Sequence, residues 1–460
     1  MKKKDYKGNF ITSTPSLYST GKGLSLDVIN QITTIKNEVD WMSNIRIKAY
    51  NAFLKLKLPK FGPSLKEIDF NDYVYYLKTT AQVVNDWANV PIQIKETFDK
   101  LGIPKSEQKY FGGVTTQFES EAIYHKTLVE FENKGVIFCD MDSALKKYPY
   151  IVKKYFGSIV SCLDNKFAAL NTAVWSGGSF IYVPKDVKLE KPLQSYFRIN
   201  SERMGQFERT LIVVDDNASV HYIEGCTAPK YTSFNLHAAV VEIFVGRGAY
   251  CRYSTVQNWS DNVLNLVTKR ALVLDDGQMD WIDGNIGSGI NMKYPACILK
   301  GDNSIGNTIS IAFARKNQIQ DTGARMIHLG KNTISKILSK SICVKGGVVN
   351  YRGKVFIGEK ANNSYSKIEC GTMILDNESF SDTLPTNIVN NNTSRIEHEA
   401  FVSNISEEQL FYMMSRGINE EQALEMLVMG FIEPFKKELP MEYAVELNRL
   451  ISLEMKGFKG

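Results

Sequence analysis

Residues able to do chemistry gather in the stretch TSRIEHEA, residues 393–400, which contains Glu397, His398 and Glu399. The surrounding sequence is typical of strands, and side chains alternate between the two faces of a strand. We therefore expect Glu397 and Glu399 to share one face and His398 to point to the other. Carboxylate and imidazole groups can bind a metal ion, but the ordinary interpretation of such a pattern is a solvated strand end.

Two of the seven cysteines have neighbours that favour a chemical role. Cys226, in HYIEGCTAP, ends a predicted strand before a Thr-Ala-Pro turn, where we expect a reachable thiol. Cys370, in SKIECGTM, lies 29 residues before Glu399, about one to two coils away if the fold is a solenoid. A thiolate with carboxylates and an imidazole forms a mixed ligand set that binds iron less permanently than four thiolates do. The other cysteines are Cys139, Cys162, Cys297 and Cys343, which we expect to pack in the core, and Cys251, whose setting leaves both roles open.

Several motifs of cofactor and nucleotide sites are missing from the sequence. The nearest match to a phosphate-binding loop runs from Gly347 to Lys354, with the wrong spacing and no hydroxyl residue after the lysine. There is no Gly-x-Gly-x-x-Gly run and no Cys-x-x-Cys pair. The sequence therefore predicts no nucleotide hydrolysis by this chain, and any metal site must be assembled from distant residues or shared with another chain.

The composition excludes several classes of partner. The 460 residues include 55 Lys and Arg against 50 Asp and Glu, and a net charge of +5 is too small to favour a nucleic-acid partner. No run of 18 apolar residues predicts a membrane span. Without an export or transit signal, the seven cysteines are expected as free thiols in a reducing compartment, either a bacterial cytoplasm or a plastid or apicoplast stroma.

The elements that must position these residues change along the chain. Apolar residues at helical spacing predict two helices over residues 25–57, and a further helix over 118–135 that ends at Gly135. From about residue 171 to 400, short β-branched and aromatic runs alternate with Gly, Asp, Asn and Pro breaks, which leaves a sandwich, a propeller or a β-solenoid. No blade signature recurs and the strands are too many for one sandwich, so we favour the solenoid. The last sixty residues return to helix, with a capping pattern at Asn419 and Gln422.

Several motifs, taken in their order along the chain, resemble those of a known family. The stretches QFESEAIYHKTLVEFENKGVIFCDMDSALKKYP, DNKFAALNTAVWSGGSFIYVP, YFRIN, HYIEGCTAP, NLVTKRA and RIEHEA resemble the SufB branch of the SufB/SufD family, which assembles iron–sulfur clusters in the SUF system. The resemblance begins near Trp41 and continues to the C-terminus. It implies a mainly β fold with α, in which a right-handed parallel β-helix core is flanked by N-terminal and C-terminal helical regions.

Together with the pattern above, the resemblance predicts four regions. They are an N-terminal largely helical region over 1–105, a mixed helical connecting region over 106–170, the β-helix core over 171–400 and a C-terminal helical domain over 401–460.

The resemblance also implies a function and its residues. The chain would be a scaffold, not an enzyme, on which a transient iron–sulfur cluster is built and then passed to apo-proteins. Cys226 would accept persulfide sulfur, and Cys370 would hold the cluster with Glu397, His398 and Glu399. Polar residues inside the β-helix would guide the sulfur: Arg198, Asn200, Thr255 and Lys269. Many family members carry a second cysteine where this chain has Ser379, which concentrates the assignment on Cys370.

The implied partners are the ATPase SufC, docked on the C-terminal helices, and either SufD or a second copy of this chain. Sulfur would come from a cysteine desulfurase with its relay protein. One alternative is a SufD-like structural partner of the ATPase that holds no cluster itself. A β-solenoid carbohydrate enzyme using Glu397 and Glu399 is a further alternative, disfavoured because no second polar groove motif accompanies the pair.

Overall fold

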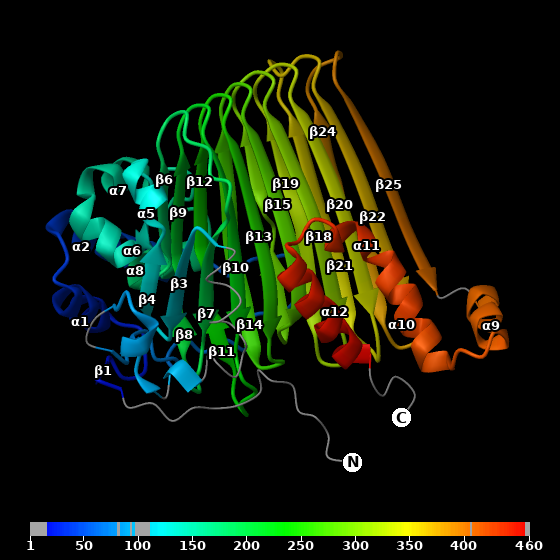
Figure 1. Ribbon diagram of the computed structural model, residues 1–460, viewed down its shortest axis with the longest axis horizontal. Helices are drawn as coiled ribbons and strands as arrows, with labels where there is room; N and C mark the ends of the chain where they lie inside the picture. The colour runs from blue at the N-terminus through cyan, green and yellow to red at the C-terminus, as the bar shows by residue number, and fades with distance from the viewer. Residues whose placement is uncertain (1–15, 81–82, 93, 97–110, 405–406, 456–460) are drawn as a thin grey trace.

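Two parallel sheets form the walls of a β-helix, with helices at both ends (Figure 1). The computed structural model describes residues 16–80, 83–92, 94–96, 111–404 and 407–455. The predicted mainly β fold, with a parallel β-helix and N-terminal and C-terminal helices, is confirmed. Within the described part of the chain, no helix is long and apolar enough to cross a bilayer.

The elements fall into three groups. The ten-stranded sheet consists of β3 (Gly113–Phe118), β4 (Glu121–Thr127), β7 (Leu193–Arg198), β10 (Ser219–Thr227), β13 (Tyr250–Trp259), β15 (Gln278–Gly287), β18 (Ile305–Ala314), β20 (Ile334–Cys343), β22 (Tyr365–Ile374) and β25 (Arg395–Asn404). The thirteen-stranded sheet consists of β5 (Ile137–Asp140), β6 (Ser179–Val183), β8 (Gly205–Gln206), β9 (Arg209–Val214), β11 (Asn235–His237), β12 (Val240–Val245), β14 (Val263–Val273), β16 (Ile290–Lys293), β17 (Ala296–Leu299), β19 (Ile319–His328), β21 (Val348–Ile357), β23 (Phe380–Thr383) and β24 (Thr386–Val389). Outside them lie β1 (Tyr18–Ser19), β2 (Leu77–Lys78), η1 (Trp87–Asn89), α1 (Leu26–Lys36), α2 (Asp40–Lys55), α5 (Val129–Asn133), α6 (Met141–Lys147), α7 (Pro149–Tyr155), α8 (Lys166–Val174), α9 (Glu407–Ser415), α10 (Glu420–Phe431), α11 (Glu433–Lys436) and α12 (Met441–Met455).

Successive coils stack in register. From β7 onward the chain alternates between the two sheets, and strands one coil apart are hydrogen-bonded in parallel. Tyr222 on β10 pairs with Tyr253 on β13, and Thr255 pairs with Asp283 on β15. Because side chains alternate along each strand, every second residue points into the interior and stacks on its equivalent in the next coil.

One corner of the β-helix is stabilised by stacked Asn and Asp side chains that hydrogen-bond between successive coils. Asp276, Asn303, Asn332 and Asn363 all have positive φ, a conformation these residues tolerate better than most. The Asn303 side chain donates to Asp276, and Asn332 donates to Asn303 at 3.2 Å. These turns fix the coil length at that corner, which keeps the strands of both walls in register.

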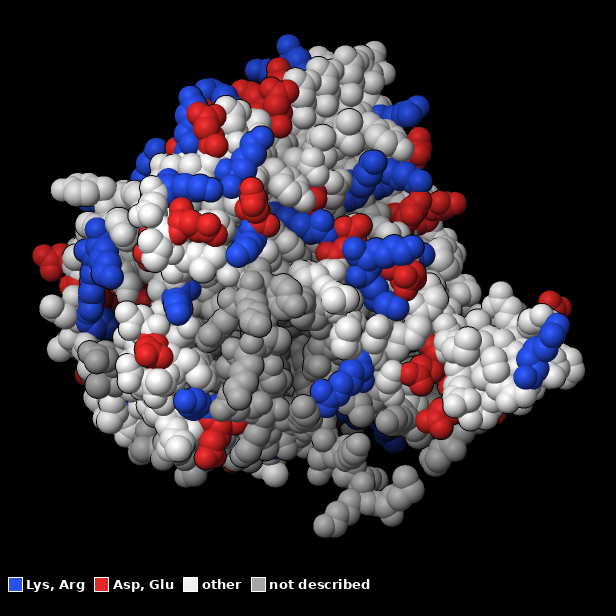
Figure 2. Space-filling view, viewed as in Figure 1, with Lys and Arg blue, Asp and Glu red and all other residues white. Residues whose placement is uncertain are grey.

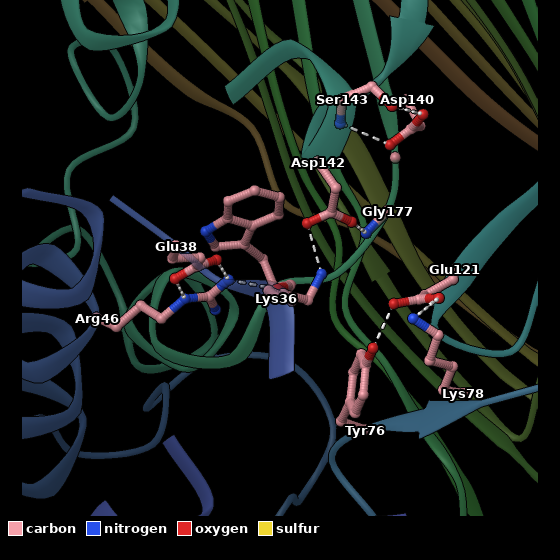
Figure 3. A network of polar contacts seen from close by, with 12 residues as sticks. Lys36, Glu38, Arg46, Tyr76, Lys78, Glu121, Asp140, Asp142, Ser143 and Gly177 are labelled. Atoms are coloured by element: carbon pink, nitrogen blue, oxygen red, sulfur yellow. Dashed lines mark hydrogen bonds and ion pairs between the residues drawn. The ribbon is translucent and has the colours of Figure 1, made fainter. Parts of the chain in front are cut away.

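The N-terminal helices cover one end of the β-helix through buried ion pairs (Figure 3). Arg46 of α2 binds Glu38 with two nitrogens, donates to the carbonyls of Ala173 and Trp175, and stacks on the Trp175 ring. Lys36 of α1 donates to Asp142 at 2.5 Å. Both predicted helices of residues 25–57 are present, and Asn37, with a left-handed backbone, separates them.

The predicted helix over 118–135 is wrong. Residues Glu121–Thr127 form β4, which pairs antiparallel with β3 around Glu119, a residue with φ of 58°. Only the short helix α5 follows, and Gly135 with φ of 77° ends the turn after it. The hairpin prevails because β3 also pairs with β7 of the wall, so sheet pairing overrides the local helical spacing.

The C-terminal helices α10, α11 and α12 lie across the outer face of the ten-stranded sheet, with α9 beyond the last strand (Figure 1). Phe435 packs so closely on Gly284 that a Cβ there would meet its ring at 3.2 Å. The predicted cap is confirmed, because the Asn419 side chain accepts from the backbone N–H of Gln422. On the face seen in Figure 2, basic and acidic side chains are interspersed over the strands.

Removing one partner of the buried pair is expected to destabilise the N-terminal end. Arg46→Met leaves the Glu38 carboxylate buried without its cation, a change that costs about 3–5 kcal/mol of unfolding free energy. The exposed pair of Arg247 with Asp275 offers a matched control, since Arg247→Met should cost less than about 1 kcal/mol. Thermal and urea unfolding of the two variants checks the difference, and equal midpoints would contradict it.

Candidate functional site

Cys226 lies at the end of β10, as predicted, but it is not reachable. Its side chain is buried, with 2% of the residue exposed, in a cluster with Phe197, Met204 and Trp259. The thiol donates to the Glu224 carboxylate, with Sγ 3.7 Å from Oε1. Burial raises the pKa of this thiol well above its usual value, and Glu224 raises it further, so the resting group is a neutral thiol.

Two buried lysines lie near this cysteine and act in the opposite direction. Lys269 of β14 donates to Thr255 Oγ1 at 2.6 Å and to Asp283 at 3.2 Å, and Lys293 of β16 donates to the same Asp283 oxygen at 3.1 Å. Their charges lower the pKa of the Cys226 thiol. Burial lowers the pKa of Lys293 itself to about 8, partly offset by Asp283. The structure thus brings together two of the predicted path residues, Thr255 and Lys269.

The other two predicted path residues belong to a separate cluster. In the register of β7 and β10, Cys226 pairs with Phe197 and Thr227 with Arg198, so Arg198 lies on the opposite face of the sheet from Cys226. Arg198 donates to the Thr227 hydroxyl at 3.1 Å. Asn200 follows β7, and its backbone N–H donates to the buried Glu119, whose pKa is raised by burial to about 7.

A row of polar side chains runs through the interior from Glu224, the hydrogen-bond partner of Cys226, to Cys370. Strand pairing aligns one inward-facing residue from each coil of the ten-stranded sheet. The row is Glu224, Thr255, Asp283, Ser310, Ser339 and Cys370. The Ser310 hydroxyl donates to Ser339 at 3.1 Å. Five strand steps of about 4.8 Å put Glu224, the neighbour of Cys226, roughly 24 Å from Cys370.

Cys370 lies on β22, one coil from the end of the β-helix. Its Sγ is 3.9 Å from Nε2 of His398 on β25. Burial raises the pKa of the Cys370 thiol to about 12, while Tyr351 and the Lys340 charge lower it. The buried Tyr351 hydroxyl lies beside this sulfur and has no other hydrogen-bond partner among the described residues. The pair of Cys370 and His398 therefore offers a sulfur and a nitrogen donor on the same inner face.

Glu397 and Glu399 point the other way. As the alternation predicts, both are exposed on the outer face of β25, while His398 is partly buried on the inner face. Glu397 accepts a hydrogen bond from the Tyr365 hydroxyl at 2.7 Å. Glu399 pairs in register with Glu369. Of the four predicted cluster ligands, the structure brings together Cys370 and His398 and directs the two carboxylates away from them.

The chain alone does not complete a metal site in its described residues. In that part of the protein, no three His, Cys, Asp or Glu side chains come close enough together to hold a metal ion. β25 ends the ten-stranded sheet, so its free edge can pair with a strand of another chain. His398 lies on this edge strand, and Cys370 lies on β22, the strand paired with it.

Sequence reasoning missed four residues of the interior. Glu224 shares a strand face with Cys226 because the two are two residues apart on one strand. The sequence Glu-Gly-Cys was therefore enough to predict this neighbour. Asp283, Lys293 and Tyr351 gave no such signal, since strand register brings them to the site from other coils. The remaining cysteines are free thiols: Cys251, Cys297 and Cys343 are buried, and Cys139 and Cys162 are partly buried.

Comparisons with known proteins identify the family of this chain. Residues 197–431 match the family described as SUF system FeS cluster assembly, SufBD core domain, and residues 28–195 match the SufBD protein N-terminal region. An iron–sulfur cluster assembly SufBD family protein of Staphylococcus aureus (strain MRSA252) is 58% identical over 456 residues, which cover 99% of this chain and 98% of the relative. A SufBD family protein of Staphylococcus haemolyticus is 58% identical over the same shares. This chain belongs to the SufBD family of iron–sulfur cluster assembly proteins.

Proposed function

We propose that this chain is the SufB-type scaffold, which accepts persulfide sulfur at Cys226 and holds a nascent iron–sulfur cluster at Cys370. The observation that carries the proposal is the in-register row from Glu224 to Cys370. Burying polar side chains costs free energy unless they are hydrogen-bonded, and this row extends from the neighbour of one candidate cysteine to the other. This arrangement is accounted for if the row handles a polar cargo between the two cysteines.

Sulfur acceptance needs the thiolate of Cys226. The proton of the thiol passes to the Glu224 carboxylate, to which it already points. The Cys226 sulfur then attacks the outer sulfur of a donor persulfide, the S–S bond to the donor breaks, and the donor leaves as a thiolate. No net oxidation occurs, because the persulfide is only transferred. Since Cys226 is buried, the donor can reach its sulfur only when the segments around it move aside.

The lysines stabilise the negative charge that this step creates. Lys269 and Lys293 both bind Asp283, and their positive charges also act on the Cys226 sulfur, whose anionic form they stabilise. Release of hydrosulfide from the Cys226 persulfide consumes two electrons from a reductant outside this chain. The hydroxyls of Ser310 and Ser339 then offer hydrogen bonds along the row toward Cys370.

The cluster would be completed at the β25 edge. Cys370 and His398 supply a sulfur and a nitrogen ligand, and a second protein chain of the SufBD family pairing with β25 supplies the rest. Glu397 and Glu399 face outward, so they reach iron only if partner binding turns this strand end. The ATPase SufC would dock at the C-terminal helices, where α9 exposes Phe411 and Tyr412.

A SufD-like structural partner is the second candidate. It is favoured by the lack of three nearby metal ligands in the described residues. It leaves unexplained why one polar row leads from Glu224, the hydrogen-bond partner of Cys226, to Cys370, so the scaffold remains the better proposal.

Replacing the two cysteines tests the scaffold. Cys226→Ala should abolish persulfide uptake, and Cys370→Ala should leave persulfide on Cys226 but lower bound iron and sulfide by at least tenfold. The measurement is anaerobic reconstitution with iron, cysteine, a desulfurase and the SufC and SufD partners. Cys297→Ala is the matched control, because Cys297 is equally buried but lies outside the row. Full clusters in both variants would leave the structural-partner role.

Removing a lysine charge should slow sulfur uptake. Lys293→Met raises the pKa of the Cys226 thiol further, so its thiolate fraction at pH 7 falls, by about tenfold for each pKa unit. The rate of sulfur uptake by the wild-type protein should rise with pH. The difference in rate between wild type and Lys293→Met should shrink above about pH 8, because Lys293 itself loses its charge there. The rate of Cys226 persulfide formation, followed by mass spectrometry, measures this effect.

The control for this experiment is Lys331→Met, at an exposed lysine remote from the row. An unchanged rate in Lys293→Met at pH 7 would remove Lys293 from sulfur acceptance.

A further inference from the structure

A cavity of about 310 Å³ lies on the outer side of the thirteen-stranded wall. Its floor is formed by β14, β16, β17 and β19, and its rim by two segments, residues 56–61 after α2 and residues 164–167 at the start of α8. A cavity of this size is at the lower end of the range of about 300–1,000 Å³ found for small-molecule sites. None of the residues proposed for sulfur or cluster binding lines it except Lys269, whose amine binds Thr255 and Asp283.

The floor contains a break in the strand ladder. Pairing with β14 stops at Val267–Lys293 and resumes at Arg270–Ala296, because Tyr294 and the following proline separate β16 from β17. The Tyr294 hydroxyl donates to Asp321, and Asp321 also accepts from Arg352 at 2.7 Å. The Tyr294 ring is thereby held in place as a wall of the cavity.

The lining carries an excess of positive charge. Four of its basic side chains, Lys57, Lys166, Arg270 and Arg325, are accompanied by one carboxylate, Asp164. Arg270 binds Asp164 at 2.7 Å, which neutralises that carboxylate. Among the residues that the structure describes, Arg325 has no carboxylate within ion-pair distance, although the residue is partly buried. Burial and the Arg270 charge lower the pKa of Arg325, and the more distant Asp164 and Tyr294 offset only part of this.

Aromatic surface lies next to this unneutralised cation. The Arg325 guanidinium is 5.3 Å from the centre of the Tyr294 ring, and the Phe61 ring meets Tyr294 edge-on at 5.9 Å. Phe61 is exposed. A planar apolar group can therefore pack on Phe61 and Tyr294 while an attached anion reaches Arg325.

We propose that this cavity binds a small organic anion, with a planar apolar body against Phe61 and Tyr294 and a phosphate or carboxylate group on Arg325. Arginine suits both kinds of head group because its planar fork donates two parallel hydrogen bonds. This site goes beyond the proposed scaffold function and does not depend on it. It lies on the opposite side of the wall from the buried amine of Lys269.

Calorimetric titration of the full chain with four probes tests the site. The probes are 1-naphthyl phosphate, 1-naphthoate, 1-naphthol and inorganic phosphate. At least one naphthyl anion should bind with a stoichiometry of one, and at least tenfold more tightly than naphthol or inorganic phosphate, because it uses both halves of the cavity. The ratio between naphthyl phosphate and naphthoate identifies the head group. If neither anion binds saturably, or if naphthol binds equally well, the proposal is overturned.

Variants then locate the binding. Arg325→Gln should weaken the preferred anion at least tenfold, and Phe61→Ala should weaken it while leaving the response to inorganic phosphate unchanged. The exposed Lys57→Gln, which does not disturb the core, should weaken it severalfold and serves as the second variant if Arg325→Gln fails to fold. Lys331→Gln is the matched surface control and should bind normally. Unchanged affinity in Arg325→Gln, or in Lys57→Gln when it replaces that variant, would overturn the assignment to this cavity.

Discussion

In-register parallel pairing of the coils is the constraint on which the rest of the structure depends. A shift of one residue in any coil would turn every inward side chain of that strand outward. Thr255, Asp283 and Cys370 share one interior row only because each coil ends at the same place, which the stacked Asn and Asp turns enforce. The register thus decides the position of the chemical groups as well as the packing of the core.

The interior charges are tolerated because they are paired. Moving an isolated ammonium group into the core would cost several kcal/mol, so Lys269 and Lys293 are stable there only with Asp283 between them. Glu224 is a second buried carboxylate close to Lys293 and to the Cys226 thiol. In the proposed mechanism, transfer of the thiol proton to Glu224 removes that negative charge, so the lysine charges can stabilise the anionic sulfur.

Sequence reasoning succeeded where the decisive pattern was local. Alternation alone placed His398 and Glu397 on opposite faces, and helical spacing alone found α1 and α2. Sequence reasoning failed where residues distant in the chain determine the burial of a side chain or the type of secondary structure. The burial of Cys226 depends on Met204 and Trp259, neither of which is its neighbour in the chain. The stretch 118–135 became a hairpin because β7 offers a pairing partner that no local window contains.

The site residues also divide into those that a local pattern predicts and those that only contacts between distant residues bring together. Glu224 and Cys226 were readable as a pair from one strand, whereas the approach of Lys293 to Asp283 follows from the packing of the two walls against each other. Neither wall's sequence specifies that distance. A prediction from motifs therefore identifies the ends of the proposed sulfur route more readily than its middle.

If this chain is the proposed scaffold, the open end of the β-helix explains why its cluster site is incomplete in the isolated chain. A fully coordinated site of four thiolates would hold iron permanently. Cys370 and His398 provide only two donors, and they lie next to an unpaired strand edge that a second chain can cover or uncover. Affinity for the cluster then depends on the presence of the partner, so separating the two chains would remove ligands and favour release. In the proposed scaffold, the exposed edge, which in an isolated protein invites aggregation, would couple assembly of the complex to retention of the cluster.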